Sequence, residues 1–175
     1  MIRLEKINWN NYEKVLKLKV TKEQEEFVAS NYESLIHAFL ALSDGDPVYA
    51  FAIYNDDEVV GFIQMGYDDD WTGEEREAWL NSSVYKKWEG KKYYFIWRFM
   101  IDKKYQHKGY GKEALIKAIE FLRTKPSGDA LYITLSYERT NEVAKKLYAS
   151  LGFYEPEEFA PFYEEDDEII AICKF

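Results

Sequence analysis

Apolar residues fall into short segments bounded by polar or glycine-containing turns, which is the pattern of β-strands separated by connections. Residues 2–7 alternate apolar and polar side chains, as a strand with one buried face does. Residues 93–101 are apolar apart from Arg98, as in a strand that is covered on both faces. The pattern predicts strands at 2–7, 48–54, 58–67, 93–101 and 131–137, and two more in the tail around an acidic turn from Glu164 to Glu168. The short polar segment 55–57 is expected to join the second and third strands as a hairpin.

Between these strands, apolar residues recur at the three- and four-residue spacing of helices. Helices are predicted at 11–20, 31–42, 111–124 and 141–152. The third helix is expected to bury Ala114, Leu115, Ala118, Ile119 and Leu122, and the fourth Val143, Ala144, Leu147 and Leu151, with Gly152 at its C-terminal cap. This order of elements predicts an α/β domain with a mixed sheet.

The chain has 175 residues, the length of one domain, and no internal repeat, low-complexity segment or linker divides residues 1–175. A charged segment with Trp71, Trp79 and Trp88 interspersed separates two predicted strands at about 68–92. An insertion of this length forms either a functional lid or surface decoration, and the sequence leaves both open.

The formal net charge of the chain is −9 and its isoelectric point is about 4.9. Such a chain is poorly suited to the phosphates of nucleic acid or to an anionic membrane surface. It suits a cationic small molecule, and it equally suits a protein whose charge serves only solubility. The first ten residues lack the apolar run of a signal peptide and no apolar stretch is long enough to span a membrane, so a cytoplasmic protein is expected.

Cysteine and histidine are scarce. Cys173 is the only cysteine and lies in an apolar strand-like segment, so an internal disulfide is excluded and burial is expected. The two histidines, His37 and His107, belong to no cluster with metal-ligand spacing, and no metal is expected.

The segment Gln106–Gly111 joins a predicted strand to a predicted helix. The backbone N–H groups of a glycine turn and the positive end of the helix meet there, which favours binding of an anion. Lysines outnumber acids around it, with Lys103, Lys104, Lys108 and Lys112 against Asp102 and Glu113. An ordinary tight turn with solvated lysines is the alternative interpretation.

Two familiar phosphate-binding motifs do not fit this turn. A Walker loop requires Ser or Thr after Gly-Lys, but Glu113 follows Gly111-Lys112. The letters of the Rossmann fingerprint are present from Gly109 to Ala114, but in that fold the first glycine follows the strand at once. Here residues 102–108 intervene, and no second nucleotide-binding half follows.

A family resemblance rests on the Q-x-x-G-x-G turn after an apolar strand and on NEVAKKLYASLGF at 141–153. Together they resemble the GNAT superfamily of N-acetyltransferases, which bind acetyl-CoA. The segments WRFMIDKKYQHKGYGKEAL and LKLKVTKEQEEFV resemble the bacterial spermine/spermidine (diamine) N-acetyltransferases in particular. The resemblance implies the GNAT acyl-CoA N-acyltransferase fold, with a mixed central sheet of about seven strands and flanking helices.

The same resemblance implies the residues that bind acetyl-CoA. Backbone amides of the family's turn wrap the pyrophosphate of CoA, a role that falls here on Gln106, His107, Lys108, Gly109, Tyr110 and Gly111, with Lys112 opening the helix. The main chain of Phe99, Met100 and Ile101 is expected to pair with the pantetheine arm, and an N–H group near Met100 to face the thioester oxygen. Asn141 is expected to reach the cofactor arm, with a plain helix N-cap as the alternative.

By the same resemblance, Tyr148 is the catalytic candidate, because its family counterpart protonates the departing thiolate. The chemistry is reasonable without the family, since a thiol has a pKa of about 8.5 and a phenol of about 10. A tyrosine at the rim of the core is the alternative interpretation.

The general base is an open question. The amine must lose a proton before it attacks, and many family members place a carboxylate for this purpose on the strand that reads Ile96-Trp97-Arg98 here. That carboxylate is missing, which leaves a water chain or an acid from another segment. Glu25, Glu26 and Glu33 are candidates, and Tyr32 and Trp97 are candidates for cation–π contact with an alkylammonium group; solvated or core positions are the alternatives.

The resemblance therefore implies an enzyme that transfers acetyl from acetyl-CoA to a primary amine by direct attack in a ternary complex. A small cationic acceptor such as spermine or spermidine is expected. An aminoglycoside, amino acid or protein amine, or a non-catalytic acetyl-CoA-binding module, are the alternatives. No nucleic acid or membrane partner is expected, and a homodimer is left open.

Overall fold

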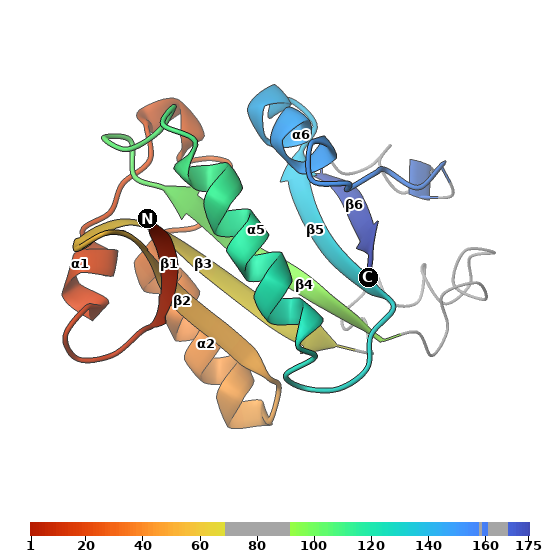
Figure 1. Cartoon of the computed structure of the whole chain (residues 1–175), viewed down its shortest axis with the longest axis horizontal. Coiled ribbons are helices and arrows are strands. Elements are labelled where there is room, and N and C mark those ends of the chain that lie inside the picture. The colour runs from red at the N-terminus through yellow and green to blue at the C-terminus, as the bar shows by residue number, and fades with distance from the viewer. Residues whose placement is uncertain (69–91, 158, 161–167) are drawn as a thin grey trace. The chain divides into compact units, whose positions relative to one another are not determined.

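The computed structural model describes residues 1–68, 92–157, 159–160 and 168–175 (Figure 1). The central part of the predicted insertion, residues 69–91, and residues 164–167 of the predicted acidic turn lie outside the described residues. In the described part of the chain, no helix is long and apolar enough to cross a membrane.

Six strands are assigned among these residues, and they form a mixed sheet in the order β1-β2-β3-β4-β5-β6. The strands are β1 (Ile2–Lys6), β2 (Val48–Asn55), β3 (Glu58–Asp68), β4 (Tyr93–Ile101), β5 (Tyr132–Glu138) and β6 (Glu168–Lys174). The helices are α1 (Tyr12–Leu16), the 3₁₀ turn η1 (Lys22–Gln24), α2 (Asn31–Asp44), α5 (Tyr110–Arg123) and α6 (Glu142–Ala149). The predicted α/β class with a mixed sheet and flanking helices is confirmed.

The chain divides into two compact units. Unit 1 comprises residues 1–66 and 96–126, and unit 2 comprises residues 67–95 and 127–175. Unit 1 therefore carries the turn at 106–111, and unit 2 carries α6.

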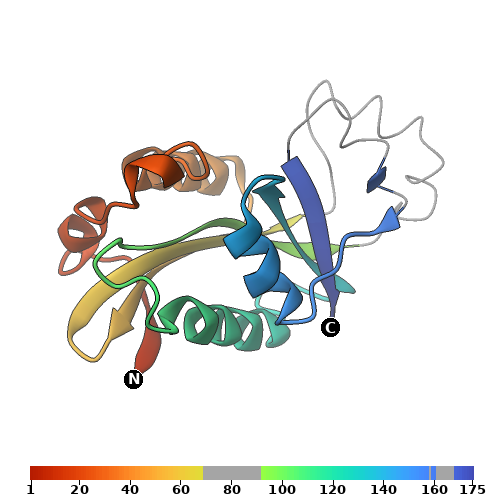
Figure 2. The same ribbon diagram turned by 90° about the horizontal axis from the view of Figure 1, so that it is seen from above.

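Unit 1 is built on a β-hairpin. β2 and β3 pair antiparallel with Phe51 opposite Ile63, and the turn between them contains Asp56, whose φ of +51° is one that aspartate tolerates. β1 pairs antiparallel with the outer side of β2. α1 and α2 cover one face of these strands and α5 covers the other (Figure 2). The predicted hairpin is confirmed.

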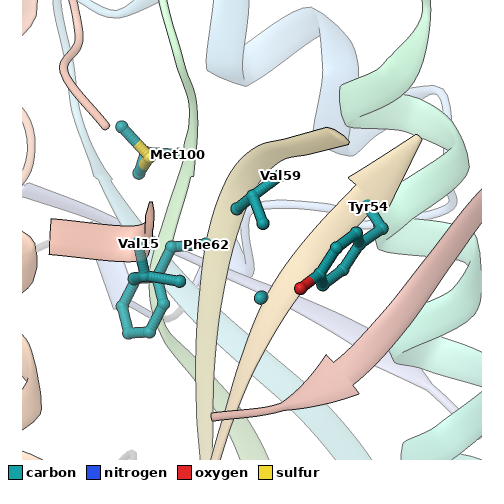
Figure 3. Close-up of a cluster of buried hydrophobic side chains, with 6 residues drawn as sticks. Val15, Tyr54, Val59, Phe62 and Met100 are labelled. Carbon is teal, nitrogen blue, oxygen red and sulfur yellow. The ribbon is translucent and has the colours of Figure 1, made fainter. Parts of the chain in front are cut away.

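The core of unit 1 lies on the face covered by α1 and α2. Val15 from α1, Phe62 from β3 and Met100 from β4 meet there, together with Val59 and Tyr54 (Figure 3). Each of these side chains is at most 6% exposed. At about 1.5–3 kcal/mol for each large apolar side chain, this cluster fixes α1 against the sheet.

On the opposite face, α5 buries the five side chains that its spacing predicts: Ala114, Leu115, Ala118, Ile119 and Leu122. The ring of Phe121 also packs edge-on against Tyr49 and Phe51 of β2, with centroids 5.1 Å apart in each pair.

The first predicted helix is wrong in extent, because α1 ends at Leu16 rather than near residue 20. The chain leaves the helix because Lys19 makes tertiary hydrogen bonds with its backbone. Its N–H donates to Oδ2 of Asp102 at 2.8 Å, and its carbonyl accepts from the N–H of Lys103 at 2.9 Å.

In unit 2, β5 and β6 pair antiparallel with Ile133 opposite Cys173, and Cys173 is buried as predicted. The other predicted tail strand is reduced to a bridge between Tyr154 and Ile172 among the described residues. Gly152 closes the last turn of α6 with φ of +89°, as its predicted capping role requires. Val143 was predicted to face inward but is 67% exposed, because it lies at the edge of the narrow apolar stripe of this short helix.

Candidate functional site

The turn before α5 has an unusual backbone. φ is +61° at His107 and +82° at Gly109, whereas Lys108 between them stays at negative φ. Alternation of this kind turns successive N–H groups toward one side of the chain, as in the anion-binding arrangements called nests. Histidine is among the residues that tolerate positive φ, and glycine adopts it freely.

The N–H groups of this turn are available to a ligand. From Gln106 to Lys112, none of the backbone N–H groups donates a hydrogen bond to any of the described residues, and Gly109 caps α5 without a side-chain bond. A Cβ atom at Gly109 would meet no atom within 4 Å, so space is open beside the turn. A run of free amides at the positive end of a helix fits the pyrophosphate of CoA.

Asp102 shapes the start of the turn, a role that sequence reasoning missed by counting it only as a charge. Its side chain is 6% exposed, and its Oδ1 accepts from the N–H of Lys104 at 2.9 Å, while Oδ2 accepts from Lys19. The Asp102 N–H in turn donates to the carbonyl of Val60 on β3. These bonds tie the end of β4 to the loop after α1.

Gln106 contributes its side chain to the structure of the turn itself. Its Nε2 donates to the carbonyl of Ile101 at 2.9 Å and to Oε1 of Gln24 at 2.8 Å. Gln24 Oε1 also accepts from the N–H of Thr21 and so holds η1 together. Because this amide is engaged, any contact of Gln106 with CoA is expected through its backbone.

β4 departs from regular strand geometry before its end. Trp97 contacts His37 of α2 by ring stacking at 6.0 Å, and Met100 Sδ lies 3.9 Å from Nδ2 of Asn31, also on α2. Residues three apart on a regular strand face opposite sides of the sheet. Contact of both with one helix therefore indicates an irregularity between Trp97 and Met100, of the kind that redirects backbone groups near functional sites.

Gly61 accommodates this distortion. An added Cβ atom at Gly61 would lie 2.5 Å from the carbonyl oxygen of Met100 and 2.8 Å from Cδ1 of Ile101. The proposed pantetheine-binding strand, Phe99 to Ile101, therefore depends on a glycine on its neighbour β3.

Gly61→Ala is expected to lower the free energy of unfolding by about 1–3 kcal/mol, because a backbone oxygen must move to admit the methyl group. Urea denaturation followed by circular dichroism measures this. The same displacement should weaken CoA binding, measured by calorimetry. An unchanged denaturation midpoint would show that the backbone of Met100 moves freely. The strand from Phe99 to Ile101 would then not depend on a glycine at position 61.

The candidate acceptor-binding residues lie on two elements of unit 1. Glu25 and Glu26 follow η1 and are exposed, and Tyr32 and Glu33 are exposed in the first turn of α2. Two of the candidates, Glu33 and Trp97, both lie close to a third residue, His37. His37, which sequence reasoning left without a role, stacks on Trp97 and lies 4.0 Å from Oε1 of Glu33.

In unit 2, Asn141 caps α6, because its Oδ1 accepts from the N–H of Ala144 at 3.1 Å. The capping role named as the alternative is therefore present, and contact with the cofactor stays a prediction.

Tyr148 is the one buried residue of α6, and its ring contacts those of Tyr137 at 5.6 Å and Phe153 at 6.0 Å. Burial raises the pKa of Tyr148 to about 12. In the described chain its hydroxyl has no hydrogen-bond partner. The phenol thus keeps its proton well into the alkaline range, but it is a weaker acid than the value of about 10 assumed from sequence.

Comparisons with known proteins agree with the fold. Over its whole length the chain is similar to the PaiA N-acetyltransferase of Thermoplasma acidophilum, crystallised with coenzyme A (15% identity, TM-score 0.61, 100% of this chain and 99% of that one). It is also similar to PH1933 of Pyrococcus horikoshii OT3 (22%, 0.61, 100% and 99%). A third similar structure is NAA60 of Arabidopsis thaliana with acetyl-CoA (14%, 0.61, 100% and 99%).

No curated protein sequence matches the chain significantly. A family model described as the acetyltransferase (GNAT) family matches residues 4–153, which include the turn before α5, β4, β5 and α6. The chain therefore belongs to the GNAT family of acetyltransferases, enzymes that use acetyl-CoA as the acetyl donor.

Proposed function

We propose that this acetyltransferase acetylates a primary amine of a small cationic acceptor, with polyamines such as spermidine as the first class to test. The observation that carries the cofactor half of the proposal is the run of free N–H groups from Gln106 to Lys112. The acceptor half is supported by the net charge of −9 and by the exposed Glu25, Glu26 and Glu33. An acidic surface raises the local concentration of polycations.

The proposed mechanism assigns cofactor binding, stabilisation of the oxyanion and protonation of the leaving sulfur to residues of this chain. Backbone amides from Gln106 to Lys112 bind the pyrophosphate, and the main chain of Phe99 to Ile101 orients the pantetheine arm. Acetyl-CoA supplies the acetyl group as a thioester. The N–H of Met100 donates a hydrogen bond to the thioester oxygen as negative charge develops on it. Tyr148 gives its proton to the sulfur as the C–S bond breaks.

Thiol release from acetyl-CoA, measured with a panel of amines, tests the proposal. The panel contains spermine, spermidine, putrescine, an aminoglycoside, lysine and a peptide with a free amine. Turnover confined to the polyamines is the expected result. Faster turnover with the aminoglycoside, lysine or the peptide would show that the acceptor is not a polyamine. The assignment as an acetyltransferase would still hold.

Binding of CoA to the free protein, measured by calorimetry, separates the two halves of the proposal. Binding without turnover on any amine would move the search to other acceptors. A lack of CoA binding would contradict the assignment of the turn. A homodimer also stays a proposal, which light scattering of the purified protein tests directly.

A further inference from the structure

The family resemblance leaves the proton of the acceptor ammonium without a base, because Ile96, Trp97 and Arg98 of β4 include no acid. A free amine of this class has a pKa of about 10.4, so that little of it is neutral at pH 7. We propose that His37 of α2 is the general base that takes this proton, an inference that rests on the proposed function.

The position of His37 follows from two contacts between α2 and β4. At the first residue of α2, Asn31 Nδ2 lies 3.9 Å from Sδ of Met100. Six residues further along α2, His37 stacks on Trp97 with the ring planes 15° apart. Both contacts join α2 to β4, so α2 runs alongside β4 from Met100 to Trp97.

This alignment places an imidazole on the same face of β4 as Met100, whose N–H is the proposed oxyanion donor. The His37 side chain is 38% exposed, so water reaches it. His37 contacts β4 three residues before Met100. The proton therefore reaches the ring along a chain of waters rather than by direct contact with the attacking nitrogen.

The surroundings of His37 suit a base that must gain and lose a proton. The stacked ring of Trp97 limits rotation of the imidazole, and Oε1 of Glu33 is 4.0 Å from its Nε2. The Trp97 ring also contacts a cation, Arg98, whose Cζ lies 5.5 Å from the ring centroid. Histidine is the one side chain whose ordinary pKa lies in the neutral range, which suits a residue that must accept and release a proton.

The protons balance in this scheme. The ammonium nitrogen carries three, of which one remains on the amide product. One passes through water to His37 and then to solvent. The third proton leaves the nitrogen as the C–N bond forms. It replaces the proton that Tyr148 gives to the sulfur when the C–S bond breaks.

The first test is the pH dependence of kcat/KM for the amine that the panel identifies as the preferred acceptor. In the wild type, the profile should bend within the neutral range, where deprotonation of the amine ceases to limit the rate. In His37→Gln the bend should disappear, the rate should rise steadily toward pH 9, and kcat at pH 7 should fall by about a hundredfold. CoA affinity, measured by calorimetry, should not change.

His107→Gln is the matched variant, because His107 is the other histidine of the chain. It should keep the bend, whatever it does to CoA affinity. A bend that survives in His37→Gln, or a kcat at pH 7 within threefold of the wild type, would overturn the proposal. Failure of the wild type to bind CoA would instead refute the proposed function.

A second readout needs no turnover. The side-chain ¹⁵N spectrum contains two imidazoles, so that His37 and His107 are each followed through a titration in the presence of CoA. Added spermidine should move the titration of His37 to lower pH, because nearby ammonium groups oppose the imidazolium. A His37 curve unaffected by saturating spermidine would place the imidazole away from the acceptor and contradict the role.

Discussion

Tyr148→Phe is expected to lower kcat by about a hundredfold while the affinity for CoA stays within twofold of the wild type. The substitution removes only the hydroxyl that protonates the leaving sulfur. A hundredfold effect is at the lower end of the range of rate effects known for general acids. We expect this because burial raises the pKa of Tyr148 to about 12, which makes the phenol a weaker acid. Steady-state thiol release and calorimetry with CoA measure the two quantities.

The thermal midpoint should stay unchanged in Tyr148→Phe, since no described residue bonds to the hydroxyl. Tyr137→Phe is the matched control, because its ring contacts Tyr148 and its hydroxyl donates to Oε1 of Glu155 at 2.7 Å. That variant should lose stability and keep most of its turnover. Equal losses of kcat in both variants would mean that packing, and not an acid, is responsible.

Gly109→Val is expected to weaken CoA binding by about 10- to 100-fold. Gly109 has a φ of +82°, where a β-branched residue costs about 1–3 kcal/mol, and about 1.4 kcal/mol corresponds to tenfold in affinity. The chain relieves this strain by rotating φ, which turns the free N–H groups of residues 106–112 away from one another. Calorimetry with CoA measures the effect.

Gly45→Val controls for backbone strain alone. Gly45 ends α2 with φ of +97°, and a Cβ atom there also meets open space. Both variants should lose similar stability in urea denaturation, but Gly45→Val should retain CoA affinity. If both lose affinity equally, general destabilisation explains the result and the turn is not the anion site.

Local pattern was sufficient for much of the fold. The period of apolar residues predicted α5 with all five of its buried side chains, and the polar residues 55–57 predicted the β2–β3 hairpin. The free amides before α5 were also predictable, because a glycine turn that opens a helix leaves its first N–H groups without partners.

The extent of α1 was not predictable in this way. Apolar spacing continues past Leu16, but both backbone groups of Lys19 bond to residues 102 and 103. The exposure of Val143 was not predictable either. Helical spacing places its side chain at the edge of the apolar stripe, but tertiary packing decides whether that edge is buried.

The sequence by itself determined the α/β class, the turn and its free amides, because each depends on residues close together in the chain. The tertiary structure alone decided the side-chain roles of Asp102 and Gln106 and the meeting of His37 with Trp97. The Lys19–Asp102 and Gln24–Gln106 hydrogen bonds join residues 83 and 82 positions apart. Such pairs leave no periodic trace in the sequence, because either partner alone is an ordinary polar residue until folding brings the two into contact.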